Sequence, residues 1–159
     1  MNQMPVTQSV PAPDLPDGLP HIAVVILTRD EALHIERAMA SVEGFASEVL
    51  VVDSGSTDET VALAQAAGAQ VLQNPWVNHA MQMNWGFARV SAQAQWVMRL
   101  DADEIVQPEL VREIREKLGA LGPEIDGVHI GRRMAFLGDP VRRGGLFPIR
   151  VLRLVRHGR

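Results

Sequence analysis

Short apolar runs alternate with amphipathic segments along most of the chain. Runs rich in branched residues predict buried strands at 21–28, 48–52, 69–72 and 95–100. Apolar residues spaced three or four apart predict helices that begin after Asp30, after Glu59, near His79 and at Pro108. Two further strand-like segments follow at 127–136 and 149–155. This order predicts an α/β fold with a mostly parallel sheet, helices on both of its faces and a β-rich C-terminal end.

The first twenty residues have a different pattern. They hold five prolines and no amphipathic period, which predicts a disordered, proline-rich leader at 1–20. The remaining residues, 21–159, are long enough to form one domain with a core of its own.

Composition excludes several classes of function. The chain has no cysteine, so it has no disulfide, no thiolate metal site and no cysteine nucleophile. It has no apolar run near the roughly 18 residues of a membrane-spanning helix, and its start lacks the pattern of a signal peptide. We therefore expect a cytoplasmic protein. Basic residues do not interleave with the tryptophans, so we expect no nucleic-acid partner.

Charge is divided unevenly along a chain whose formal net charge is −4. Eight arginines and one acid lie between Arg132 and Arg159, so the preceding part is strongly acidic. This asymmetry predicts an anionic ligand near the C-terminal part, or peripheral contact with the inner surface of a membrane. The alternative is a solvated basic face that balances the acidic half.

Polar residues follow three of the predicted strands. Thr28 and Asp30 come after the first, Asp53 after the second, and Asp101 with Asp103 after the fourth. The carboxyl ends of parallel strands face the same edge of a sheet, so these residues are expected at one crevice. Carboxylates there suit Mg²⁺ or Mn²⁺ and, through the metal, a substrate's phosphates. Each residue alone is explained as well by a turn or a helix cap, and their coincidence favours a site.

Smaller features lead to local expectations. Ser56 and Glu59 have the spacing of a capping box at the start of a helix. Arg99 either pairs with an acid of the site or lies at the sheet edge. His34 and His79 are expected to be surface histidines.

Three segments together carry a family resemblance: VILTRDE at 25–31, VVDSGSTD at 51–58 and LDADE at 100–104. They resemble family 2 glycosyltransferases, whose GT-A fold is a Rossmann-like α/β fold. QMN at 82–84 and the stretch 138–156 resemble the lipopolysaccharide-core branch that is similar to β-1,4-glucosyltransferases. The resemblance covers residues 21–159 and implies a nucleotide-sugar-binding domain.

The resemblance also implies roles for individual residues. It assigns the nucleotide-sugar site to Thr28, Glu31, Asp53, Gln82, Asn84 and Asp101. Within this set, Thr28 and Glu31 line the uridine pocket and Asp53 binds uracil or ribose. Asp103, with Asp101, holds the divalent cation, Mg²⁺ or Mn²⁺. The family usually has asparagine where Asp30 stands, and we expect no direct role for this added charge beside a diphosphate.

The implied reaction is transfer of a sugar, with inversion, from a nucleotide-sugar, favoured as a UDP-sugar, to a glycan or lipid-linked saccharide acceptor in cell-envelope polysaccharide or lipopolysaccharide-core synthesis. The family's catalytic acid would lie past residue 159, so we expect a C-terminally incomplete domain and assign no catalytic base. One alternative is a non-catalytic nucleotide-sugar-binding fragment or scaffold. Another is a sugar-nucleotide pyrophosphorylase, but residues 28–31 lack the glycine-rich phosphate loop that such an enzyme needs.

Overall fold

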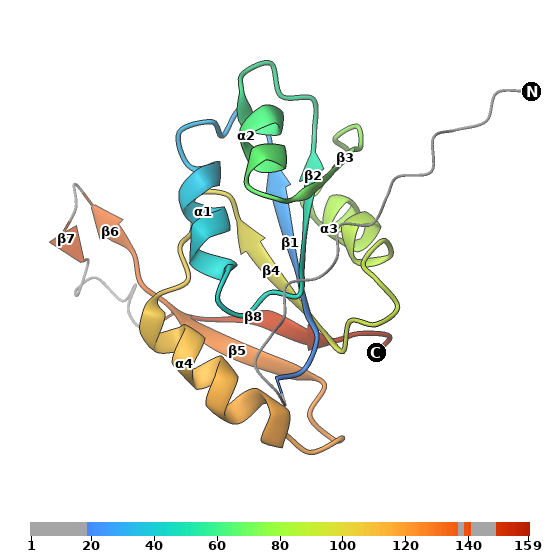
Figure 1. The fold of residues 1–159 in the computed structure, drawn as a ribbon, viewed down its shortest axis with the longest axis vertical. Helices are drawn as coiled ribbons and strands as arrows, with labels where there is room; N and C mark the ends of the chain where they lie inside the picture. The colour runs from blue at the N-terminus through green and yellow to red at the C-terminus, as the bar shows by residue number, and fades with distance from the viewer. Residues whose placement is uncertain (1–18, 137–138, 141–148) are drawn as a thin grey trace, which may run out of the picture.

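The computed structural model describes residues 19–136, 139–140 and 149–159 (Figure 1). Most of the predicted leader, residues 1–18, lies outside this part, and so does the basic, glycine-rich segment at 141–148 with Arg142 and Arg143. Within the described ranges, no helix is both long enough and apolar enough to cross a bilayer.

A six-stranded sheet forms the centre of the molecule (Figure 1). Its order is β3 (Gln70–Gln73), β2 (Glu48–Asp53), β1 (Ile22–Thr28), β4 (Trp96–Asp101), β8 (Ile149–Arg156) and β5 (Gly127–Arg132). The first four strands in this order are parallel, whereas β8 is antiparallel to both β4 and β5. The predicted α/β fold, with a mostly parallel sheet and a β-rich C-terminal end, is therefore confirmed.

Helices cover both faces of this sheet (Figure 1). They are α1 (Ile35–Val42), α2 (Thr60–Ala66), α3 (His79–Phe87) and α4 (Pro108–Lys117), which the short 3₁₀ helix Leu118–Ala120 extends. One core holds buried residues of α1, α2 and α4 against one face, and a second core holds α3 against the other. Alternate residues of β1 enter the two cores, which explains why that strand is apolar throughout.

Gly86 lets α3 lie close to the sheet. A Cβ atom there would stand 2.8 Å from Val25 Cγ1 and 3.0 Å from Val52 Cγ2. Such contacts are too short for carbon atoms, so a side chain would push the helix away from β1 and β2. This close packing sets the distance of α3 from β1 and β2.

Several element boundaries differ from the sequence predictions. The strand predicted at 127–136 is interrupted, since β5 ends at Arg132 and the short β6 (Ala135–Phe136) pairs instead with β7 (Asp139–Pro140). The helix expected after Asp30 begins only at Ile35. The helix expected at 79–90 ends at Phe87.

The capping box expected at Ser56 is wrong. Helix α2 begins at Thr60, and its N-cap residue Glu59 makes no side-chain capping bond. The Ser56 hydroxyl donates instead to the carboxylate of Asp53, three residues before it. A capping hydroxyl accepts an N–H of the helix, but the Ser56 oxygen accepts the backbone N–H of Asp30 at 2.9 Å.

Candidate functional site

The carboxyl ends of three neighbouring strands meet at one rim of the sheet. In the strand register Thr28 lies beside Asp53, and Leu27 lies beside Asp101. Because β2, β1 and β4 are adjacent and parallel, the loops that follow them emerge side by side. This is the convergence that the alternation of strands and helices predicts.

Asp53 organises the loop that follows β2. Its carboxylate is fully buried and accepts hydrogen bonds from Thr28 Oγ1 at 3.2 Å, from Ser56 Oγ at 2.5 Å, and from the backbone N–H groups of Gly55 and Ser56 at 3.0 Å. Gly55 has a φ of +89°, which glycine adopts without strain. Both carboxylate oxygens of Asp53 thus hold the turn in place, and its contact with uracil or ribose stays a prediction.

Asp30 joins the loop after β1 to the loop after β2. Its backbone N–H donates to Ser56 Oγ at 2.9 Å, and its Oδ1 accepts from the N–H of Thr57 at 2.7 Å. Its φ of +54° is left-handed, a conformation that aspartate tolerates better than most residues. Asp30, which stands where the family usually has asparagine, therefore stabilises the contact between these two loops.

The same two loops are joined again through Thr60. Its hydroxyl accepts from the N–H of Glu31 at 2.8 Å and donates to Asp58 Oδ1, while Asp58 Oδ2 accepts from the N–H of Ala32 at 3.1 Å. The hydrogen bond from the Thr60 hydroxyl lowers the pKa of the Asp58 carboxyl below its ordinary 3.8, and the backbone donors lower it further. This side of the rim is therefore held by hydrogen bonds within the protein.

Glu31 is the more accessible of the two residues implied in the uridine pocket. Its carboxylate is partly exposed and lies 2.7 Å from His34 Nδ1, whereas Thr28 is buried against Asp53. His34, expected as a plain surface residue, thus orients a side chain of the candidate site. The signal was its spacing of three residues from Glu31, which places two side chains of a helical turn together.

Gln82 connects α3 to the rim. Its buried amide donates to Ser54 Oγ at 3.0 Å and to the carbonyl of Asn74 at 2.9 Å, and it accepts from Asn74 Nδ2 at 2.6 Å. Asn84 is exposed. Residues two apart on a helix point in nearly opposite directions. The structure therefore brings Gln82 to the end of β2 and does not bring Asn84 there with it.

The side chains at the end of β4 are held mainly by ion pairs, in contrast to the hydrogen-bonded loops after β1 and β2. Asp101 is partly exposed, and its Oδ2 lies 3.2 Å from Arg153 Nη2. The same nitrogen lies 2.5 Å from Glu104 Oε1, which is also 3.2 Å from Arg132 Nε. The Arg153 side chain is only 6 % exposed, and its Nη1 has no hydrogen-bond partner among the described residues.

Arg99 and His79 complete the surroundings of Asp101. Arg99 Nη2 lies 3.6 Å from Asp101 Oδ1 and 3.2 Å from His79 Nε2, and that His79 nitrogen is 3.8 Å from Asp101 Oδ1. Of the two alternatives for Arg99, pairing with a site acid is the one observed. Sequence reasoning missed His79, whose signal was its position at the start of a helix that packs across β1 and β2.

Asp103 is exposed and lines a cleft of about 950 Å³. In the described part of the chain it has neither an ion pair nor a side-chain hydrogen bond. Those same ranges contain no group of three or more histidine, aspartate or glutamate residues able to hold a metal alone. Mg²⁺ commonly binds through one or two carboxylates together with a substrate's phosphates. That Asp103 and Asp101 together hold the cation stays a prediction.

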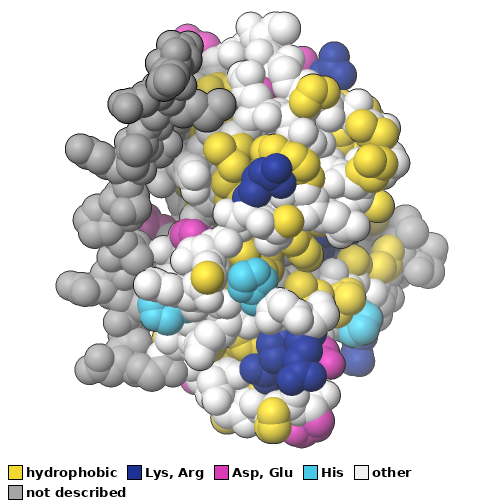
Figure 2. All heavy atoms as spheres, turned by 90° about the vertical axis from the view of Figure 1, so that its right-hand side faces the viewer, with side chains coloured by type: hydrophobic (Ala, Val, Ile, Leu, Met, Phe, Trp, Pro, Cys, Tyr) yellow, Lys and Arg dark blue, Asp and Glu magenta, His cyan; other side chains and the backbone are white. Residues whose placement is uncertain are grey.

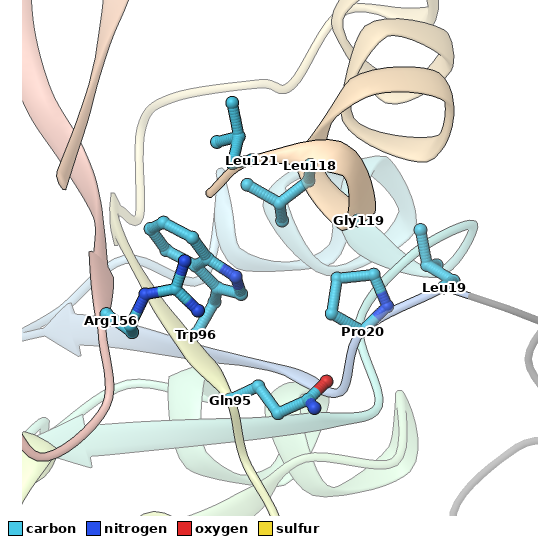
Figure 3. Close-up of a pocket in the computed structure, with 8 residues that line it drawn as sticks. All are labelled: Leu19, Pro20, Gln95, Trp96, Leu118, Gly119, Leu121 and Arg156. Atoms are coloured by element: carbon cyan, nitrogen blue, oxygen red, sulfur yellow. The ribbon is translucent and has the colours of Figure 1, made fainter. Parts of the chain in front are cut away.

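A second hollow, of about 270 Å³, lies at the opposite end of the strands (Figure 3). The guanidinium of Arg156 stacks there on Trp96 at 4.5 Å and donates to the carbonyls of Ile125 and Gly122 at 3.0 Å. Its described lining has no carboxylate. These contacts explain Arg156 as a structural residue and leave the rim as the candidate site.

Figure 2 shows the face of the molecule on the side of α3. Apolar side chains there alternate with histidines and with basic side chains, several of which gather low on this face. Trp76, Val77 and Met81 are exposed near the start of α3, and the Trp76 ring meets His79 edge-on at 6.5 Å.

Solved structures with the same architecture are GT-A glycosyltransferases. One is glucosyl-3-phosphoglycerate synthase from Mycobacterium tuberculosis in complex with UDP, with a TM-score of 0.56 and 29% identity. The match covers 68% of this chain and 43% of that one. Another structure of that enzyme, with Mn²⁺, UDP and glucosyl-3-phosphoglycerate, has a TM-score of 0.52, 28% identity, and coverage of 68% and 42%. The fold and its rim thus define a GT-A glycosyltransferase.

Sequence comparison gives the family. The family described as Glycosyl transferase family 2 matches residues 23–149, and the chain belongs to it. The lipopolysaccharide core biosynthesis glycosyltransferase LpsC of Rhizobium meliloti is 35% identical over 146 residues, which cover 89% of this chain and 52% of LpsC. An uncharacterized glycosyltransferase of Rickettsia bellii is 44% identical over 93 residues, 58% of this chain and 31% of that protein. The matched region spans about a third to a half of these relatives.

Proposed function

We propose that the rim binds a UDP-sugar together with Mg²⁺ or Mn²⁺. In the full protein it would serve inverting transfer of the sugar to a saccharide or lipid-linked acceptor. The main support for the proposal is that the loops after β1, β2 and β4 meet at one rim. The first two loops are joined by hydrogen bonds, and the third carries the accessible carboxylates. The UDP complexes of the structural neighbours support the donor, and the name of LpsC supports a role in lipopolysaccharide-core synthesis. We propose the cytoplasmic face of the membrane as the place of this role.

The two sides of the rim would have different tasks. The loops after β1 and β2, with Thr28, Glu31 and Asp53, would receive the nucleoside, and Asp53 would act mainly by holding backbone N–H groups and hydroxyls in position. Gln82 would act in the same way by fixing Ser54.

On the other side, Asp103 with Asp101 would hold the cation against the diphosphate. A bound divalent cation neutralises charge that develops on the leaving diphosphate. Arg153 keeps the Asp101 carboxylate oriented towards the rim, and Arg99 does so from the opposite side. We assign no catalytic base to a described residue.

Calorimetric titration of the 159-residue chain with UDP tests this proposal. We expect binding in MnCl₂ that EDTA abolishes. In Asp103→Asn the affinity should fall at least about tenfold, because the variant loses a charged ligand of the cation. The control is Asp126→Asn, an exposed aspartate at the other end of the strands. Equal UDP affinity in wild type and Asp103→Asn would contradict the assignment of Asp103.

A further inference from the structure

We propose that the cleft beside Asp103 binds an oxyanion group of the acceptor, a phosphate or a carboxylate, through Arg153 and Arg133. This inference rests on the proposed function, because it names the chemistry of the acceptor for the same reaction.

The carrying observation is the incomplete pairing of Arg153. Its side chain is 94% buried, yet only Nη2 meets carboxylates, at Asp101 and Glu104, and Nη1 has no partner among the described residues. A guanidinium is a rigid fork of donors that matches an oxyanion with two parallel hydrogen bonds. A buried charged donor without a partner is costly, so a ligand that supplies the missing acceptor is favoured.

A second basic residue stands at the same cleft. Arg133 lines it and is exposed, and within the described ranges Arg133 has no carboxylate at ion-pair distance. Arg132 is already paired with Glu104. Among the acids that line the cleft, Glu113 pairs with Lys117 at 2.6 Å, whereas Glu109 has no ion pair within the described ranges. Arg133 is thus an accessible cation in the same cleft that the buried guanidinium of Arg153 lines.

The position of the cleft favours the acceptor over the donor. Its lining comes from the segment after β4, from α4 and from the region of β5, together with Arg37 and Arg153. It includes no residue of the loops after β1 and β2, where the nucleoside is proposed. Asp103, the proposed cation ligand, lines this cleft, so an anion in the cleft would lie near the proposed cation.

Binding of three sugars to the full chain, saturated with UDP and MnCl₂, tests the inference. The probes are glucose 6-phosphate, glucuronate and unmodified glucose, measured by calorimetry. We expect one of the two anionic sugars to bind at least about tenfold more tightly than glucose, since a charge-assisted pair adds this much. Whichever anionic sugar binds identifies the group as phosphate or carboxylate.

Three variants distinguish specific binding in the cleft from nonspecific attraction of an anion to a basic surface. Arg133→Gln should weaken the anionic sugar about fivefold or more, and Arg153→Lys should weaken it because the fork is lost while the charge remains. The control Arg112→Gln removes an exposed arginine of α4 outside the cleft and should change nothing. Arg133→Gln tests the proposal even if Arg153→Lys does not fold.

The outcomes distinguish the two proposals. If UDP does not bind with Mn²⁺, the proposed function fails. If UDP binds normally but no anionic sugar binds more tightly than glucose, or if Arg133→Gln behaves like Arg112→Gln, the acceptor inference alone is overturned. If glucose 6-phosphate displaces UDP, the arginines serve the donor diphosphate, which also overturns it.

Discussion

The two sides of the rim are stabilised by different interactions. On the side of β1 and β2, Asp53 is fully buried and its carboxylate meets four donors, while Asp30 and Thr60 join the two loops by further hydrogen bonds. On the side of β4, Asp101 and Glu104 depend on arginines, and Asp103 is exposed.

The side of β1 and β2 is therefore a preformed binding surface, whereas the charged side chains on the side of β4 can exchange their ion-pair partners. Where donors and acceptors are already paired within the protein, few side chains need to move when a ligand binds. Ion pairs at a partly exposed site can exchange an arginine for a cation, or a carboxylate for a ligand anion, at small net cost. We therefore expect substitutions on the first side to lower stability most, and those on the second side to act mainly on binding.

The largest expected effect is that of Asp53→Ala. It leaves two backbone N–H groups and two hydroxyls without their acceptor, so we expect the free energy of unfolding to fall by about 2–4 kcal/mol. Urea unfolding followed by tryptophan fluorescence measures it. The control Asp126→Ala should change stability by less than about 0.5 kcal/mol, since that aspartate is exposed. A similar small loss in Asp53→Ala would remove the contrast between the two sides.

A smaller effect is expected from Arg99→Gln on the other side. The Arg99–Asp101 pair is partly exposed at 3.6 Å, so its loss should cost about 0.5 kcal/mol or less. Repeating the urea unfolding in about 0.5 M NaCl should shrink this cost further, because salt screens exposed pairs, while the Asp53→Ala loss should change little. Arg112→Gln is the matched control. A loss in Arg99→Gln as large as in Asp53→Ala would show that the charged side is equally preformed.

The smallest effect concerns Asp58. Because its pKa is lowered in the folded protein, this group contributes stability above its ordinary 3.8, and the contribution is lost as pH falls through the lowered value. Thr60→Val removes the main donor, so the pKa should rise towards 3.8 in a carboxyl NMR titration. Thr60→Ser keeps the hydroxyl and should keep the low pKa. An unchanged pKa in Thr60→Val would assign the effect to the backbone donors.

Much of the fold was predictable from local pattern. The apolar stretch of β1 and the polar residues at the ends of β1, β2 and β4 locate the sheet and its rim, because burial on both faces requires such a run. The family resemblance added the implied roles of Asp101 and Asp103.

Other features depend on contacts between distant parts of the chain. Arg153 pairs with Asp101 across 52 positions, and no local pattern selects one arginine among the eight between Arg132 and Arg159. The expected capping by Ser56 failed for a related reason, since sequence spacing cannot show that its oxygen accepts the N–H of Asp30 from another loop. The position of His79 likewise follows from the packing of α3 on β1 and β2, which Gly86 permits.

The placement of β8 has a consequence for folding on the ribosome. It follows β5 in the sequence, yet it lies between β4 and β5 in the sheet. Until residues 149–156 leave the exit tunnel, β4 keeps one edge without a partner and β5 has no strand to join. The nascent chain can therefore assemble β1 to β4 early, while the buried guanidinium of Arg153 and the cleft that it lines form only once β8 has been synthesised.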